Sequence, residues 1–377
     1  MDLELSEDQK LFRNTTAKFL DNELPVEKVR AINKEGGGFP AEFWTQGAEL
    51  GWAALLVPEE LGGGSISGNG FQDLAIVAEE FGRLVSPGPL LPVNTVIAGL
   101  VEGAAIGGPD HTETIEGLMS GELIGTWAAY EPKGHWDPLN PSTTATKNGD
   151  NYVITGVKDR VEAGDAAGVF LVTAKTASGV ALFLVPADAA GVSVELVDSL
   201  DFVRHHATVT FSDVTVSADA MVGTESATAD IVERMLQVVV ALQCAEMNGA
   251  INRVFEFTVQ WAFDRYSFGR PLASYQALKH RFSDMRTWIE CCNATADEAV
   301  KAVNNRAENS ARLVSVAKAY IGTKSVQIIQ DCVQMHGGLG VTWEHDCHLY
   351  LRRATTDRQL FGTPADHKRR IADLIGL

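Results

Sequence analysis

The sequence predicts an α+β protein in which a helical domain, a β domain and a helical bundle follow one another. Apolar residues recur at helical spacing up to about residue 120, and short β-branched runs bounded by Gly, Asp, Ser or Pro fill about 121–227. Long Ala-, Val- and Leu-rich helical patterns return from 228. We therefore expect an N-terminal α-helical domain (1–120), a middle antiparallel β-barrel or sandwich (121–227) and a C-terminal four-helix bundle (228–377).

The composition indicates a globular protein without a nucleic-acid or membrane partner. The 377 residues are enough for two or three well-buried domains. The net charge of −18 argues against binding to nucleic acid or to an anionic membrane surface. No apolar run approaches the roughly 20 residues of a membrane span, and no signal peptide is recognisable. Five cysteines without a CxxC pair favour free thiols in a reducing compartment, so we expect a cytoplasmic protein.

The N-terminal domain is predicted to begin with a capped helix. Ser6 and Gln9 have the spacing of a capping box, and one apolar stripe follows them at positions 11, 12, 15, 19 and 20. The glycines of "PEELGGG" (58–64) break the chain before a second helical segment, "GFQDLAIVAEEFGRLV".

The later domains are predicted from runs of the same kind. The β runs read "NYVITGVK", "GVFLVTAK", "GVALFLVPA", "GVSVELVD" and "ATVTFSDVTV". The helical patterns that follow cover 228–264, 276–304 and 307–335.

Basic residues gather at a break between two of these long helices, in "DRYSFGRPLASYQ". Arg265 ends one helix, Phe268 and Gly269 form the break, and Gln276 begins the next helix. An arginine beside a glycine turn and a helix start is suited to holding a phosphate. Alone, the stretch is equally a helix–helix turn whose basic side chains face water.

A second glycine motif, "QMHGGLG" (334–340), follows the last long helix. Gly337 and Gly338 can be a simple C-terminal cap. Two consecutive glycines also let the backbone approach a flat ligand such as adenine or ribose. The motif alone leaves both readings open.

Together, in this domain order, the two motifs resemble the acyl-CoA dehydrogenase family over nearly the whole chain. "VPEELGG", Glu131-Pro132 and "FSDVTV" resemble its N-terminal loop, the start of its flavin segment and the end of its β domain. The resemblance implies FAD as cofactor, held across a dimer interface, so that these motifs bind the flavin of the neighbouring subunit. The residues so implied, for the pyrophosphate and the adenosine end, are Arg265, Phe268, Gln276, Gln334, Gly337 and Gly338.

The half-site that would hold this chain's own flavin departs from the family. The run Lys133–Trp136 replaces the small polar residues that normally follow Glu-Pro. Arg160 and Glu162 stand where the family has a tryptophan and a threonine against the flavin ring. A carboxylate beside a reduced, anionic flavin would oppose the charge that hydride transfer creates.

The resemblance also shows where a catalytic base should stand. The family uses a glutamate to remove the α-proton of the acyl thioester. Phe361 occupies its usual position, and Val239, 26 residues before Arg265, occupies the alternative one. Neither side chain can accept a proton. Glu246 lies on nearly the same helix face as Val239 but about 10 Å further along the axis. A buried polar or interface role suits it better than that of a relocated base.

The stretch "TWEHDCH" (342–348) raises the question of a metal. It offers His345, Cys347 and His348, but the sequence shows no second ligand cluster, so we expect no metal site. The stretch resembles bacterial acyl-CoA dehydrogenases built from two unlike chains, several of which act on CoA esters of sterol side chains.

The sequence is therefore interpreted as the non-catalytic subunit of a heteromeric (α2β2) acyl-CoA dehydrogenase. A homologous partner chain would carry the catalytic glutamate and the acyl-CoA pocket, with an electron-transfer flavoprotein as acceptor. Two alternatives stay open. One is a self-sufficient homotetramer with a relocated base, and the other is a flavin-free scaffold or CoA-ester-binding protein on the same fold.

Overall fold

The N-terminal domain is helical in the computed structural model, which describes residues 5–132 and 136–377. The predicted capping box is present: Ser6 Oγ accepts the Gln9 amide, and the Gln9 side chain accepts the Ser6 amide. The elements of this domain are α1 (Glu7–Glu23), α2 (Val26–Lys34), α3 (Ala41–Glu49), η1 (Glu59–Leu61), α4 (Gly70–Leu84), α5 (Leu90–Ala105) and α6 (Thr112–Ser120).

The middle domain is one curled, seven-stranded sheet with the order β1-β4-β2-β3-β7-β6, in which β5 also pairs with β4. Its strands are β1 (Gly125–Ala128), β2 (Thr144–Asn148), β3 (Asn151–Glu162), β4 (Val169–Lys175), β5 (Val180–Pro186), β6 (Val192–Val197) and β7 (His206–Ser217). Most pairs are antiparallel as expected, but β4 pairs in parallel with β1 and touches β2 in parallel. Alternating apolar residues show which segments are strands, but they do not select the partner of each strand.

The C-terminal domain is helical. Two predicted ranges, 228–264 and 276–304, match the observed helices, while the third begins later, at Ser310. α7, α8 and α9 pack side by side, and α10 and α11 pack on α9. The elements after the sheet are η2 (Ala218–Ala220), η3 (Glu225–Ala227), α7 (Thr228–Asp264), β8 (Tyr266–Ser267), β9 (Arg270–Pro271), η4 (Leu272–Ser274), α8 (Gln276–Asn304), α9 (Ser310–His336), η5 (Gly337–Val341), α10 (Cys347–Gln359) and α11 (Pro364–Leu374).

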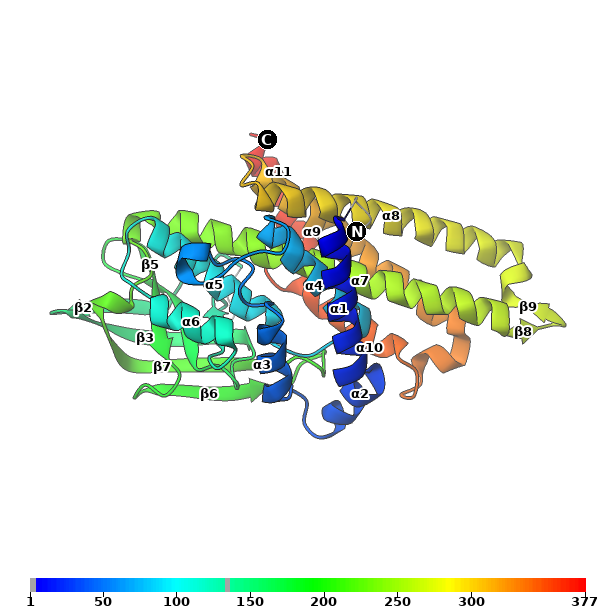
Figure 1. Cartoon of the computed structure of the whole chain (residues 1–377), viewed down its shortest axis with the longest axis horizontal. Coiled ribbons are helices and arrows are strands. Elements are labelled where there is room, and N and C mark those ends of the chain that lie inside the picture. Colours follow the sequence, from blue (N-terminus) through cyan, green and yellow to red (C-terminus); the bar gives the residue numbers. More distant parts are fainter. Residues whose placement is uncertain (1–4, 133–135) are drawn as a thin grey trace.

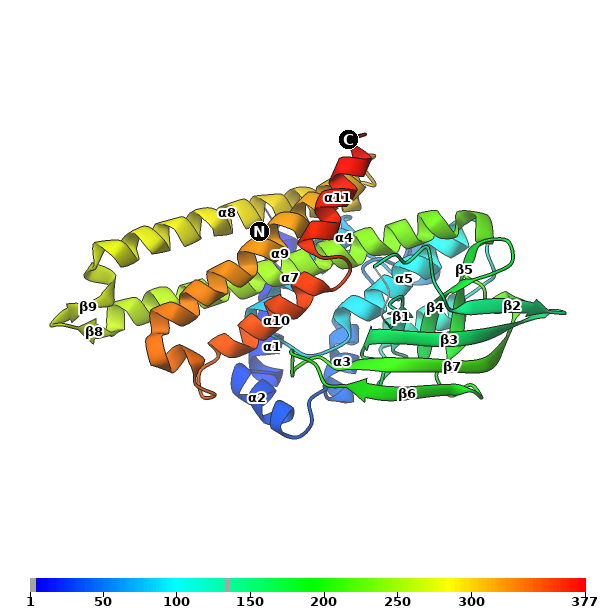
Figure 2. The same cartoon turned by 180° about the vertical axis from the view of Figure 1, so that it is seen from behind.

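Helix α7 is the central element of the molecule. Figure 1 shows it running from the β sheet to the β8–β9 hairpin at the opposite end, and Figure 2 shows α9 and α10 on the other side. Two glycines bring α4 against it. A Cβ on Gly82 would lie 1.9 Å from the Glu246 carbonyl oxygen, and one on Gly249 would lie 1.9 Å from that of Glu79. The N-terminal and C-terminal domains therefore meet at backbone contact.

Within residues 5–132 and 136–377, no helix has both the length and the apolar character that a bilayer span requires.

Candidate functional site

A cavity of about 660 Å³ opens where α7, the β8–β9 hairpin, α8 and the end of α9 meet. Arg265, Gln334, Gly337 and Gly338 all line it, so four of the six predicted cofactor residues lie around one space. The remaining lining residues are Trp261, Ser267, Leu272, Ala277, Leu278, Arg281, Asp331, Met335 and His336.

The cavity carries an arginine whose charge is not paired. Arg281 forms an ion pair with Asp331 at 2.5 Å. Among the described residues no carboxylate pairs with Arg265, whose guanidinium lies 5.8 Å from the centre of the Trp261 ring and is exposed. An unpaired guanidinium beside an open cavity is suited to binding an anionic group such as a phosphate.

The two glycines at the end of α9 differ in whether the backbone conformation requires a glycine. Gly337 is the C-cap of the helix with φ +62°, a conformation that favours glycine. Gly338 has no such φ, and an added Cβ would meet nothing within 4 Å. The packing of this chain therefore does not require a glycine at 338, whereas close approach of a ligand to the backbone would.

Phe268 and Gln276, the other two predicted cofactor residues, do not line the cavity. Phe268 forms the turn of the β8–β9 hairpin at φ +50° and is 97% exposed. Gln276 is the exposed first residue of α8. Tyr266 and Phe263 nearby are also largely exposed. This apolar tip, on an otherwise charged chain, has the character of a surface that another protein covers.

A cluster of aromatic rings surrounds Phe361, the residue that the sequence resemblance aligns with the family's catalytic base. Phe361 stacks on Trp127 of β1 at 6.1 Å between centroids and meets Trp136 edge-on at 5.9 Å. Tyr130 lies 4.5 Å from Trp136, and its Oη accepts the Phe361 amide. Burial raises the pKa of Tyr130, so its phenol is neutral. This aromatic cluster contains no side chain that titrates near neutral pH.

Val239, the alternative position of the base, is buried on α7. Glu246 is fully buried about two turns further along the helix and forms ion pairs with both Arg204 and Arg353. A buried carboxylate that is held by two guanidinium groups is not accessible to a substrate. The structure therefore argues against Glu246 as a relocated base.

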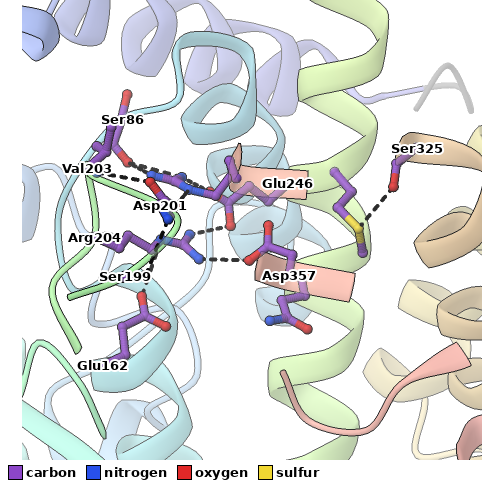
Figure 3. A network of polar contacts seen from close by, with 12 residues as sticks. Ser86, Glu162, Ser199, Asp201, Val203, Arg204, Glu246, Ser325 and Asp357 are labelled. Carbon is purple, nitrogen blue, oxygen red and sulfur yellow. Dashed lines mark hydrogen bonds and ion pairs between the residues drawn. The ribbon is translucent and has the colours of Figure 1, made fainter. Parts of the chain in front are cut away.

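Glu246 belongs to a buried charge network that joins all three domains (Figure 3). Arg353 donates to Asp201 and to the Ser86 carbonyl as well as to Glu246. Arg204 pairs with Asp357 at 3.1 Å and with Glu162 at 3.3 Å. Figure 3 shows Glu246 and Asp357 directed toward Arg204 between α7 and the loop before β7.

The network has two consequences for charge. Burial and the Glu246 carboxylate raise the pKa of Asp357 to about 8 despite the nearby arginines. The Glu162 carboxylate, which the sequence predicted beside a flavin ring, forms an ion pair with Arg204.

The remaining family positions of this half-site have structural roles. Burial raises the pKa of Glu131, but hydrogen bonds from Lys158 and from the amides of Thr143 and Ser142 outweigh it and bring the pKa to about 2. Arg160 lies over the Tyr130 ring at 4.5 Å. In the substituted run Lys133–Trp136, residues 133–135 lie outside the described part, and Trp136 belongs to the aromatic cluster.

Comparison with known families identifies the fold. Residues 6–105, 126–214 and 229–376 match the N-terminal, middle and C-terminal domains of the acyl-CoA dehydrogenases. The chain belongs to the acyl-CoA dehydrogenase family. Its three-domain architecture, with a curled β domain between two helical domains, is that of the family, and the predicted fold class is confirmed.

Individual acyl-CoA dehydrogenases and their relatives match almost end to end. Acyl-CoA dehydrogenase IpdE2 of Mycolicibacterium smegmatis is 29% identical over 369 residues, covering 97% of this chain and 98% of its own. A variant of the Tcur3481–Tcur3483 steroid ACAD is 25% identical with a TM-score of 0.88, and 98% of each chain is covered. PigA with FAD and proline has a TM-score of 0.91 at 23% identity, with both chains covered completely, which shows the shared fold alone.

Sequence reasoning found the cavity residues but missed the aromatic cluster. Trp127, Tyr130 and Trp136 come from the β domain, while Phe361 follows α10 more than 200 positions later. Only the substitution at 361 was visible in the sequence, where a large aromatic replaces an acid. A phenylalanine at a position made for a charged group is a signal that apolar partners surround it.

Proposed function

We propose that this chain is the non-catalytic subunit of a heteromeric FAD-dependent acyl-CoA dehydrogenase and contributes half of a flavin site to a homologous partner chain. The observation that carries the proposal is the difference between the cavity at Arg265 and the aromatic cluster at Phe361. The cavity is open and has an unpaired cation, whereas apolar rings fill the position of the base. One half-site is kept and the other is lost.

The residues around the cavity fit the distal part of FAD. Arg265 would hold the pyrophosphate by charge-assisted hydrogen bonds. Gln334 and the backbone at Gly337 and Gly338 would take the adenosine end, where the space in front of Gly338 is open. Bound FAD supplies the hydride acceptor of the dehydrogenation. In this proposal the partner chain contributes the contacts to the flavin ring, the acyl-CoA pocket and the glutamate that removes the α-proton.

The exposed tip of the β8–β9 hairpin supports assembly with the partner. Phe268 can become buried only against another chain, because it is 97% exposed and belongs to the β8–β9 hairpin, which stands at one end of the molecule (Figure 1). Phe268 and Gln276 lie outside the cavity in the single chain, and contact with the partner's flavin would give them their family roles. The same dimer would bring the cavity of this chain to the flavin of its partner.

The substrate class is proposed from similarity. The resemblance to a steroid ACAD supports a CoA ester of a steroid side chain, and an electron-transfer flavoprotein would reoxidise the flavin. The five cysteines form no disulfide, which agrees with a reducing cytoplasm.

The decisive measurement is the number of FAD molecules per complex, because it counts the complete flavin sites. The chain is purified alone and together with the homologous partner, and each species is examined by native mass spectrometry with flavin quantitation. We expect an α2β2 complex with two FAD and little or no flavin in the chain alone, because each unlike pair completes one site. Four FAD per tetramer, or an active yellow homotetramer, would favour the self-sufficient enzyme. A stable complex without any flavin would favour the scaffold.

A further inference from the structure

Three potential metal ligands meet at the end of α9. One ligand atom each of His336, His345 and Cys347 lie within 4.8 Å of one another. His336 is the last residue of α9, His345 lies in the following loop, and Cys347 is the first residue of α10. The sequence offered His345, Cys347 and His348 on one stretch, and no metal was expected because no second ligand cluster was visible. The fold adds a further ligand, His336, from eleven residues before Cys347.

Backbone hydrogen bonds orient both imidazole rings. His336 Nδ1 lies 2.8 Å from the Cys332 carbonyl oxygen, which can only accept, so Nδ1 carries the proton and Nε2 the lone pair. The Cys347 amide donates to His345 Nδ1 at 3.2 Å. Cys347 Sγ lies 3.8 Å from His336 Nδ1. Ligating histidines typically donate the N–H of the ring nitrogen that does not bind the metal, as His336 Nδ1 does here. His345 Nδ1 accepts a hydrogen bond instead, so coordination through either nitrogen of His345 would break its contact with the Cys347 amide.

The surroundings are apolar on one side and open on the other. Phe257 meets His336 at 5.7 Å and His345 at 5.9 Å between centroids, and Trp261 stacks on His336 at 5.4 Å. His336 and Cys347 are buried, whereas His345 is half-buried and gives access from solvent. Three protein ligands and one accessible side leave a fourth position for water.

We propose that His336, His345 and Cys347 form a zinc site that fixes the start of α10 to the end of α9. Mixed imidazole and thiolate ligands suit Zn²⁺, with bonds of about 2.0–2.1 Å to nitrogen and about 2.3 Å to sulfur. Tetrahedral ligands at such bond lengths lie roughly 3.4–3.7 Å apart, so ligand atoms that are up to 4.8 Å apart would close by about 1.1–1.4 Å at most. On coordination the Cys347 thiol releases its proton to solvent, and both imidazoles bind in the neutral form.

The position of the site gives it a structural role next to the cavity. His336 lines the cavity together with Arg265, and Gly337 and Gly338 follow directly. The loop from 337 to 346 would be held at both ends by the metal. The site would therefore stabilise the backbone that is proposed to approach the adenosine end of FAD. It goes beyond the proposed function, and zinc binding does not depend on a partner chain.

The test uses the full chain, stripped of metal by a chelator and titrated with Zn²⁺ against a competing chelator. We expect one zinc per chain by native mass spectrometry. Co²⁺ as a probe should give a thiolate-to-cobalt charge-transfer band and the d–d intensities of tetrahedral cobalt. Cys347→Ser should remove the charge-transfer band, and His345→Ala should weaken zinc binding by at least about 10-fold. Circular dichroism checks that both variants are folded.

Two matched controls separate this site from adventitious binding. Cys291→Ser removes the exposed thiol on α8, and His348→Ala removes a histidine that stacks on Trp343 outside the cluster. Both should bind zinc as the parent chain does. The proposal is overturned if the folded parent chain binds no zinc, or if the cobalt band survives in Cys347→Ser. It is also overturned if Cys291→Ser removes the band. Flavin content of the α2β2 complex, measured separately, tests the proposed function alone.

Discussion

The cavity at Arg265 and the aromatic cluster at Phe361 differ in packing: the first leaves room for a ligand, and the second is filled with side chains. The cavity remains open, and Gly338 keeps its backbone accessible where this chain has no packing reason for a glycine. The aromatic cluster fills its region with four rings from β1, the segment after it and the end of α10. In the proposed function, the aromatic cluster is a half-site that has been packed with side chains, and its rings add stabilising contacts.

Filling the region around Phe361 with aromatic rings stabilises the folded chain. Aromatic pairs contribute about 0.5–1.5 kcal/mol beyond the burial of their area. A polar, hydrated active site contributes no such contacts and commonly costs stability. A chain that leaves catalysis to its partner can therefore replace a catalytic group with packing. Arg265 has not been replaced in this way, which is expected if the partner still needs it.

The largest expected effect concerns the buried charge network, which lies between the two regions. Glu246→Ala leaves Arg353 and Arg204 without one of their buried carboxylates and should lower the free energy of unfolding by about 3–5 kcal/mol. Urea denaturation measures it. Glu256→Ala, exposed on the same helix, should change stability little. If Glu246 were instead a base, its loss would abolish turnover while leaving stability nearly unchanged.

The second-largest effect is expected on flavin binding at the open cavity. Arg265→Ala should weaken flavin binding by the α2β2 complex by about 1.5–3 kcal/mol, because a charge-assisted contact to the pyrophosphate is removed. This corresponds to roughly 10- to 150-fold weaker binding and, at an unchanged association rate, to an equally faster loss of flavin on dilution. Absorbance of released FAD measures it, and Gln276→Ala should act in the same direction more weakly. Arg286→Ala, paired with Glu290 on the exposed face of α8, is the control. Full flavin retention in Arg265→Ala would contradict the proposal that this chain contributes half of a flavin site to its partner.

A smaller effect is expected at acid pH, where Glu131 supports the edge of the aromatic cluster. Its pKa of about 2 lies below the ordinary 4.5, so its contribution is fully present above pH 4.5. As pH falls toward 2 the unfolded chain takes up the proton first, and the contribution is lost. Glu131→Gln should lower stability at pH 7 and flatten the stability curve between pH 4.5 and 2. Glu60→Gln, in the exposed helix η1, should leave the curve unchanged.

The smallest expected effect is that a substitution at Phe361 creates no enzymatic activity. Phe361→Glu restores the family's acid, but the folded variant alone should show no acyl-CoA dehydrogenase activity, since Trp127, Tyr130 and Trp136 still fill the space. Phe361→Leu serves as the matched variant without a charge. An assay with steroid side-chain and straight-chain acyl-CoA esters measures it. Appreciable turnover by isolated Phe361→Glu would show that the chain's own flavin half-site is intact.

Local sequence signals predicted the parts of the structure that local interactions determine. The capping box at Ser6 and Gln9 and the bounds of α7 and α8 follow from side-chain spacing and from the break at Gly269. The parallel pairing of β1 with β4 did not follow, because strands far apart in the chain choose each other by packing.

The candidate site also contains residues that the sequence could reveal and residues that it could not. Arg265 and Gly338 could be found because their motifs lie on short stretches at helix ends. The partners of Glu162 and Glu246 could not, since Arg204 and Arg353 come from other elements. His336 was missed as a companion of Cys347 because a helix end and a loop bring them together only in the folded chain.

The backbone contact between α4 and α7 bears on how this protein can move. Gly82 lies against the Glu246 carbonyl and Gly249 against that of Glu79, so the two helices meet backbone to backbone at two points. Close packing at these points restrains sliding of α4 along α7 and hinge motion between the N-terminal and C-terminal domains.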